Sequence, residues 1–144
     1  MSTVAQLLAR KAKGPQVLSI DPDSPVLDAI RLMAEHGIGA LLVMQGSKLA
    51  GIVSERDYAR KVILKGRSSG DTPVSQIMTA QVTTVRPDQS AQECMSLMTN
   101  GHFRHLPVVE GERVIGMLSI GDLVRAVLEE QQQTIEQLEH YIRS

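Results

Sequence analysis

The stretch "GIVSERD" at residues 51–57 returns as "GMLSIGD" at residues 116–122, 65 positions later. Each copy has a glycine, two apolar residues and then Ser-x-x-Asp. The apolar part is typical of a buried strand, and Ser-x-x-Asp is typical of a helix start. The same strand-to-helix corner is therefore predicted twice. Its two acids, Asp57 and Asp122, either cap their helices or belong to a binding site.

The repeat extends well beyond these two corners. Residues 17–58 align without a gap on residues 82–123, and 11 of the 42 pairs are identical. In each copy a β-branched run precedes apolar residues spaced i, i+3, i+4 and i+7, which predicts an amphipathic helix. Two further apolar runs and a second helix follow. The predicted order is strand–helix–strand–strand–helix, with first strands at 17–20 and 82–85, first-helix ends at Gly37 and Gly101, and hairpin turns at Gly46 and Gly111.

The composition is that of a globular chain with an aliphatic core. Apolar residues make up 42%, aromatic residues only 2%, and the formal net charge is −1. Such a chain lacks the basic, stacking surface that nucleic-acid binding uses. No apolar run reaches the length of about 18 residues that spans a membrane, and the N-terminus has no secretory-signal pattern. We therefore expect a cytoplasmic protein that contacts neither nucleic acid nor membrane.

Three further segments lie before, between and after the two copies. Residues 1–10 predict a short amphipathic helix, and residues 66–80 predict a connector with one helical turn at "VSQIM". The last helix is expected to extend from about Gly121 to Ile142. Either this helix packs on its own domain or it forms a self-association seam. Its seam positions recur at heptad-like spacing: Val124, Leu128, Gln131, Ile135, Leu138 and Ile142.

A tandem unit of this order, ending each copy in an apolar strand and Ser-x-x-Asp, resembles the CBS domain pair, also called a Bateman module. The first copy, "IGALLVMQGSKLAGIVSERDYARKV" at residues 38–62, is especially similar to small stand-alone bacterial CBS-pair proteins. The resemblance implies an α/β (α+β) fold of two β-α-β-β-α motifs, related by a pseudo-two-fold axis and forming one compact module. The expected divisions are an N-terminal helix at 1–14, a first motif at 15–65, a linker at 66–80, a second motif at 81–130 and a helical extension at 131–144.

The resemblance also implies a function. CBS pairs typically bind adenosine compounds in two clefts between the motifs and associate into homodimers. AMP is the ligand expected first, with ADP, ATP, NAD and S-adenosylmethionine as further candidates. The expected role is a regulatory, signal-transducing sensor that changes conformation on binding and acts on a protein effector. The alternative is a protein-interaction scaffold whose clefts are empty or degenerate.

The Ser-x-x-Asp corners have two interpretations. The first is a capping box, although that motif usually has Glu or Gln at its last position and both copies have the shorter Asp. The second is a ligand site, because each corner places a helix start at the end of a strand, where free N–H groups attract anions. With the resemblance, we expect Asp57 and Asp122 to hold ribose hydroxyls, while Ser54 and Ser119 cap the helices and contact ligand.

Further ligand contacts are expected around the corners. Basic and polar side chains are expected at the phosphates, namely Arg56, Arg60, Arg104, His105, Arg86 and Thr84. Aliphatic side chains and backbone groups are expected to line the adenine slots, namely Ile20, Ile38, Ala40, Val53, Val85, His102 and Leu118. Because Gly121 stands where the first copy has Arg56, the two sites are expected to hold phosphates differently.

Other chemistries are not indicated. The sequence has no Gly-x-x-x-x-Gly-Lys-Ser/Thr phosphate loop, and its four histidines lack metal-ligand spacing, so no metal site is expected. The single Cys94 falls on an apolar helix face and is expected in the core. No serine or cysteine has an evident base partner, so an enzyme is not expected.

Overall fold

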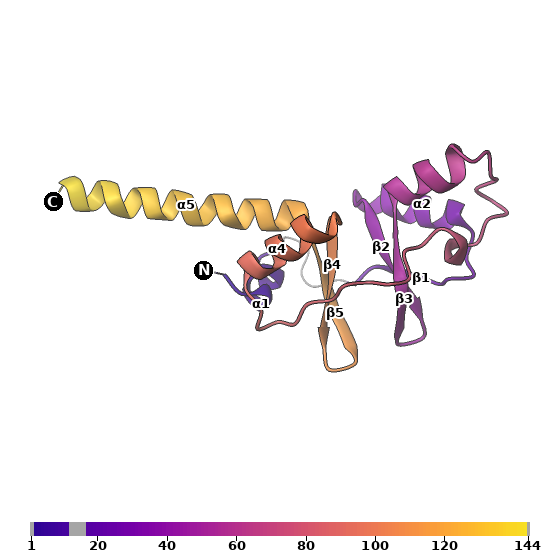
Figure 1. The fold of residues 1–144 in the computed structure, drawn as a ribbon, viewed down its shortest axis with the longest axis horizontal. Coiled ribbons are helices and arrows are strands. Elements are labelled where there is room, and N and C mark those ends of the chain that lie inside the picture. The colour runs from indigo at the N-terminus through magenta and orange to yellow at the C-terminus, as the bar shows by residue number, and fades with distance from the viewer. Residues whose placement is uncertain (1, 12–16, 144) are drawn as a thin grey trace. The chain divides into compact units, whose positions relative to one another are not determined.

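The computed structural model describes residues 2–11 and 17–143, which form two compact units. The first unit consists of residues 17–83 and 111–114, and the second unit contains residues 2–11, 84–110 and 115–143. Helices and strands follow the predicted order in the first unit and, apart from the first strand, again in the second (Figure 1), which confirms a mixed α/β fold built from two repeats.

A three-stranded sheet in the order β1-β2-β3 forms the base of the first unit. β1 (Ser19–Ile20) pairs in parallel with β2 (Ala40–Gln45), and β2 pairs antiparallel with β3 (Lys48–Ser54). A parallel pair needs a crossover connection, and the helix α2 (Val26–His36) supplies it. The predicted strand–helix–strand–strand order is confirmed here.

The apolar face of α2 closes the core of the first unit. Val26, Ala29 and Met33 are spaced i, i+3 and i+7 and are all buried. They belong to one cluster with Leu41 of β2 and Val53 of β3, which are paired in the sheet. Val53 is fully buried, so its side chain lies inside this core.

The first corner leads from β3 into α3 (Glu55–Tyr58), which continues as a π-helical segment, η1 (Ala59–Ile63). The connector then returns to the sheet after the predicted turn, η2 (Val74–Gln76). Ile52 and Thr79 exchange two backbone N–H···O bonds of 3.0 and 2.8 Å. This approach requires Gly51, because a Cβ there would lie 2.5 Å from the Thr79 carbonyl oxygen.

The second unit repeats the order with a shorter sheet. α4 (Ala91–Gly101) precedes β4 (His105–Glu110) and β5 (Arg113–Ser119), which form a two-stranded sheet. The strand predicted at 82–85 is reduced to one parallel bridge between Val85 and Val108. Within that run only Val85 is fully buried, while its two threonines are exposed and give the core no apolar surface.

The N-terminal helix belongs to the second unit. α1 (Val4–Ala9) starts at Thr3, whose hydroxyl accepts a hydrogen bond from the N–H of Gln6. Val4, Leu7 and Leu8 of α1 are buried in one cluster with Cys94. This confirms the predicted helix and the core position of Cys94, and it assigns the helix to the core of the second motif.

The two motif helices end at equivalent positions but on different residues. α2 ends as predicted at Gly37, which has a left-handed backbone with φ of 62°. α4 has Gly101 as its last residue, as predicted, and the left-handed residue that follows it is His102, with φ of 56°. Gly101 is needed for packing, because a Cβ there would collide with the ring of Phe103.

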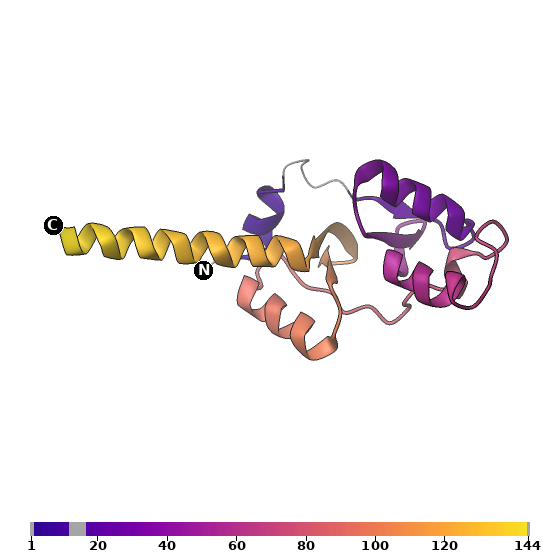
Figure 2. The ribbon, with the colours of Figure 1, turned by 90° about the horizontal axis from the view of Figure 1, so that it is seen from above.

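The last helix, α5 (Ile120–Arg143), has two distinct parts (Figures 1 and 2). Its first turns pack on the second unit, with Leu123 and Ala126 buried. The N–H and hydroxyl of Ser2 both donate to the Glu130 carboxylate at 2.7 Å. Residues 131–143 are all exposed. Packing on its own domain therefore accounts for α5 only as far as Glu130.

None of the helices formed by residues 2–11 and 17–143 combines the length and the apolarity that crossing a bilayer requires.

Candidate functional site

Each Ser-x-x-Asp corner forms a reciprocal capping box. In the first unit, Ser54 Oγ accepts from the Asp57 N–H at 3.1 Å, and Asp57 Oδ2 accepts from the Ser54 N–H at 3.0 Å. In the second unit the same bonds join Ser119 and Asp122, at 3.2 and 2.8 Å. The capping interpretation is confirmed in both copies. One carboxylate oxygen of each acid is used by its cap.

A backbone bond fixes each corner beside the strand pair that precedes it. The Glu55 N–H donates to the Gly39 carbonyl at 3.0 Å, and the Ile120 N–H donates to the Arg104 carbonyl at 2.8 Å. Gly39 and Arg104 directly precede β2 and β4, respectively. The two helix starts are therefore held at matching places of the repeat.

In the first unit a lysine on the same helix faces the acid. The side chain of Asp57 is only 15% exposed, and Lys61 Nζ lies 3.2 Å from its Oδ1. The same Nζ donates to the Ile77 carbonyl at 2.9 Å. The two residues are spaced i, i+4, which places them on one helix face. The ammonium group thus bridges the capped acid and the connector.

In the second unit the same role is taken by a lysine from another part of the chain. Ala126, which is buried, stands where the first copy has Lys61. Lys11, just beyond α1, places its Nζ 3.2 Å from Asp122 Oδ2 and donates to the Met117 carbonyl at 2.7 Å. Arg125 Nη2 lies 2.6 Å from the other oxygen, Oδ1. Asp122 is only 10% exposed and is held by two cations.

Sequence reasoning missed Lys11 because it lies outside the repeat and 111 positions before Asp122. One signal was available. The second copy replaces the lysine that faces the acid with an alanine, and a half-buried carboxylate without a cation is costly. That replacement predicts a cation from elsewhere, although it does not say which one.

The electrostatics of the second corner follow from these contacts. Burial alone would raise the pKa of Asp122, but the Ser119 N–H and the Lys11 ammonium outweigh it and keep this pKa below its usual range. The pKa of the nearby His105 is lowered, mainly by burial and then by the charge of Lys11, although Asp122 opposes the shift. At neutral pH the corner therefore combines a charged acid, two cations and a neutral imidazole.

The expected phosphate contacts fall into two groups. His105 at the start of β4 lies within the electrostatic reach of Asp122, and the backbone of Arg104 bonds to the start of α5. Arg56 and Arg60 are exposed on the helical segment that follows the first corner. By contrast, Arg86 lies 3.3 Å from Asp88, and Thr84 is exposed in the segment before α4. No hydrogen bond or ion pair among the described residues links Arg86 or Thr84 to Asp122.

The expected adenine contacts differ in their exposure. The side chains of Ala40, Val53, Val85 and Leu118 are at most 1% exposed. Val53 belongs to the core of the first unit, and Val85 and Leu118 belong to the core of the second unit, so these side chains are packed in the interior. Ile20 and Ile38 are half-buried against the core of the first unit, and His102 is exposed. These three are the adenine candidates with accessible surface.

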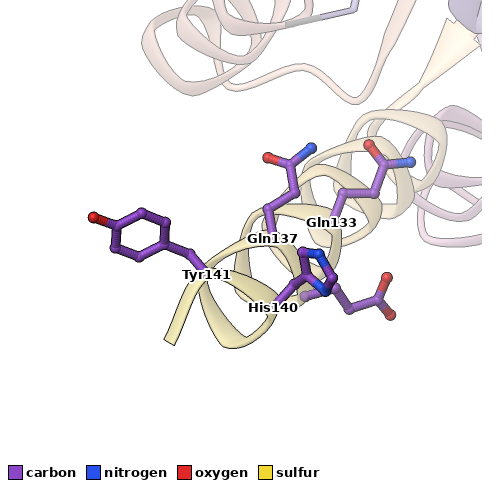
Figure 3. Close-up of a pocket in the computed structure, with 5 residues that line it drawn as sticks. Gln133, Gln137, His140 and Tyr141 are labelled. Carbon is purple, nitrogen blue, oxygen red and sulfur yellow. The ribbon is translucent and has the colours of Figure 1, made fainter. Parts of the chain in front are cut away.

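A hollow on α5 is separate from the two corners. A shallow hollow lies on the exposed part of α5, and all its lining residues come from that one helix (Figure 3). It includes none of the expected ligand residues. Residues 2–11 and 17–143 also hold no group of three or more His, Cys, Asp or Glu side chains placed to bind a metal ion.

Comparison with known proteins identifies the repeat. The sequence profile of the CBS domain matches residues 9–64 and again residues 74–129. The chain is 40% identical over 149 residues to the mitochondrial CBS domain-containing protein CBSX3 of Arabidopsis thaliana, covering 99% of this chain and 72% of that protein.

Solved structures agree with this match. A protein with CBS domains from Burkholderia ambifaria MC40-6 is 55% identical, with a TM-score of 0.87 over 90% of this chain and 96% of that one. The CBS domain pair of protein MJ0100, solved with 5-methylthioadenosine and S-adenosyl-L-methionine, has a TM-score of 0.79 over 90% of this chain and 98% of that one. At 21% identity, the second likeness shows a shared fold alone.

Proposed function

Because the chain belongs to the CBS domain family, with one CBS domain in each half, we propose that it is a regulatory module that binds an adenosine ligand at its Ser-x-x-Asp corners. AMP is the ligand proposed first, and ADP, ATP, NAD and S-adenosylmethionine are further candidates. The MJ0100 pair, which shares the fold, was solved with two adenosine compounds. The proposed role is sensing by a shift between conformations, without catalysis.

The observation that supports this most directly is the state of the two acids. Each is only 10–15% exposed and uses one oxygen in its cap, while a side-chain cation approaches the other oxygen. Lys61 and Arg125 are 44% and 67% exposed, so both can move away. Two ribose hydroxyls can then donate to the carboxylate, and the displaced cation remains close enough to pair with a phosphate.

The expected phosphate and adenine contacts are proposed around the two carboxylates. Arg56 and Arg60 are proposed at the phosphates of the first site, and Arg104 and His105 at those of the second. Ile20, Ile38 and His102 remain as proposed adenine contacts. The second site differs because Asp122 already has two cations, Lys11 and Arg125. We expect it to favour a ligand with more negative charge than the first site does.

The test is calorimetric titration of the protein with each candidate ligand. Asp57→Ala and Asp122→Ala are each expected to weaken binding at their own site by roughly 10- to 100-fold, since two charge-assisted hydrogen bonds are lost. Glu93→Ala is the matched control, because it breaks the Ser90–Glu93 capping box of α4 at a place with no proposed ligand role.

Two outcomes would contradict the proposal. One is the absence of binding by any of these ligands at millimolar concentration. The other is a loss in both aspartate variants no greater than in the Glu93→Ala control. Either result favours the alternative of a protein-interaction scaffold, in which the capped and ion-paired acids serve only to hold the corners.

Homodimerisation, a protein effector and a cytoplasmic location complete the proposal. The location in particular stays a prediction, since the plant relative is described as mitochondrial.

A further inference from the structure

The helix α5 has an apolar stripe from Val124 to Ile142 that its own unit does not cover. The exposed fractions are 42% for Val124, 58% for Leu128, 48% for Ile135, 57% for Leu138 and 80% for Ile142. When Gln131 is included, the successive positions from Val124 to Ile142 are separated by four, three, four, three and four residues. That is the a/d pattern of a coiled-coil seam. A solvated helix face would not repeat large aliphatic residues in this way.

We propose that α5 pairs with α5 of a second copy of this chain, and that the two helices are antiparallel. The argument for a second copy is self-complementarity: when two such stripes are paired, aliphatic residues face aliphatic residues and opposite charges lie side by side. In the antiparallel arrangement, Leu128 of one copy faces Leu138 of the other, and Val124 faces Ile142. Gln131 faces Ile135 on either side of the centre. Four of the six resulting layers are therefore aliphatic on both sides.

The flanking positions decide the orientation. At the edges of the seam, antiparallel pairing brings Arg125 beside Glu139 of the second copy, which joins opposite charges at both ends. It also places Val127 beside Tyr141, so that apolar surface meets apolar surface. Parallel pairing would instead put Glu139 beside Thr134 and leave Arg125 without an acid across the seam. Charge complementarity at the edges is what sets helix orientation in such pairs.

The size of the seam sets the strength of the association. From Val124 to Ile142 the helix rises 1.5 Å per residue, which gives a strip about 27 Å long and one helix wide. A stable protein interface covers about 800 Å² on each partner. A single helical strip of this length is smaller, and Gln131 adds a polar group to it. We therefore expect a reversible dimer whose population rises with protein concentration.

The pairing also connects the seam to the second corner. Arg125 lies at the base of α5, where its Nη2 is 2.6 Å from Asp122 Oδ1. Glu139 of the second copy would compete with Asp122 for this guanidinium. The dimer would thus alter the charge around Asp122 without touching the core of either unit.

Cysteine cross-linking tests the orientation. The distance limits of a disulfide allow it only between facing positions. Leu128→Cys and Leu138→Cys are prepared separately, and each is oxidised alone and as an equal mixture. Antiparallel pairing predicts linked dimers in the mixture and not in either variant alone, because identical positions lie about 15 Å apart along the axis. The unmodified chain is the control for Cys94, which is fully buried.

Sedimentation tests the association itself. Ile135→Asp is expected to weaken dimerisation by at least roughly tenfold, and Gln131→Leu to strengthen it by a similar factor, since each changes one seam layer. Both positions are exposed, so the folds should be intact by circular dichroism. Gln133→Asp, on the outer face of the same helix, is the matched control and should have no effect.

Linked dimers of Leu128→Cys alone would overturn the antiparallel arrangement in favour of a parallel one. A chain that stays monomeric at high concentration, or a dimer that neither Ile135→Asp nor Gln131→Leu alters, would overturn the seam. None of these results depends on whether the corners bind a nucleotide.

Discussion

His102 shows how a single backbone conformation distinguishes the two copies. It has φ of 56° at the position where the first copy has Gly37, with φ of 62°. A side chain in this left-handed region costs free energy, which glycine avoids. His102→Gly is therefore expected to raise the free energy of unfolding by about 1 kcal/mol. Chemical denaturation measures this.

The matched control is Gly37→Ala, which should lower the free energy of unfolding by about 1 kcal/mol. Among the residues that the structure describes, no heavy atom beyond the two chain neighbours lies within 4 Å of the added Cβ, so only the backbone conformation is tested. If His102→Gly is instead destabilising, the imidazole makes a stabilising contact that outweighs the strain. A strained residue at a candidate site would then point to a role in binding.

His105 predicts how stability changes with pH. Its pKa in the folded chain is lowered from the ordinary 6.5, first by burial and then by Lys11, with Arg104 adding to the effect and Asp122 opposing it. The unfolded chain therefore binds a proton at a higher pH than the folded chain does. Stability from this group is complete above about pH 6.5 and is lost as the pH falls below it.

The measurement is the melting temperature at about pH 7.5 and about pH 5.5, compared between the natural chain and His105→Gln. The variant should lose less stability over this interval. Asp122 does not interfere, because its pKa is lowered from 3.8 and it titrates only in stronger acid. An equal loss in both proteins would mean that His105 takes up its proton without cost when folded.

At the scale of elements, local sequence patterns predicted helices and corners, but they did not predict contacts between residues far apart in the sequence. The i, i+3, i+7 spacing predicted α2, and the doubled Ser-x-x-Asp predicted both corners. The strand at 82–85 is nearly lost, because a β-branched run forms a strand only when partners bury it. Val53 and Leu118 lie inside the cores, since a period of two identifies a face of a strand without telling which face is covered. Lys11 reaches Asp122 from outside the repeat, and no local pattern records that.

The helix α1 gives a prediction about packing across the sequence. Leu7 is 4% exposed in the core of the second unit, so Leu7→Ala is expected to lower the free energy of unfolding by roughly 2–5 kcal/mol. Leu64→Ala is the control, because Leu64 is 77% exposed and its truncation should change stability by no more than about 0.5 kcal/mol. Thermal denaturation compares the two. Similar melting temperatures would mean that α1 contributes little to this core.

At the scale of the whole molecule, the sequence identified two copies of one motif but not how the chain shares its parts between them. The alignment of 17–58 on 82–123 predicted two motifs that follow each other in the sequence. The structure instead completes the second core with residues from the start of the chain, so that Val4 and Leu123 lie in one cluster. The apolar spacing of α1 predicts that one face is buried, but it does not predict which of the two cores buries that face.

The position of α1 in the core of the second unit has a consequence for synthesis on the ribosome. All fully buried residues of the first unit's core cluster lie between Val26 and Ile77, so that core can form while the chain is still being made. The helix α1 emerges earlier and must wait, because it is buried in one core with Cys94 and Leu123, which lie far behind it in the chain. For most of translation its buried leucines are exposed to solvent and to chaperones. The helix α1 is therefore made before the rest of its core and joins that core late.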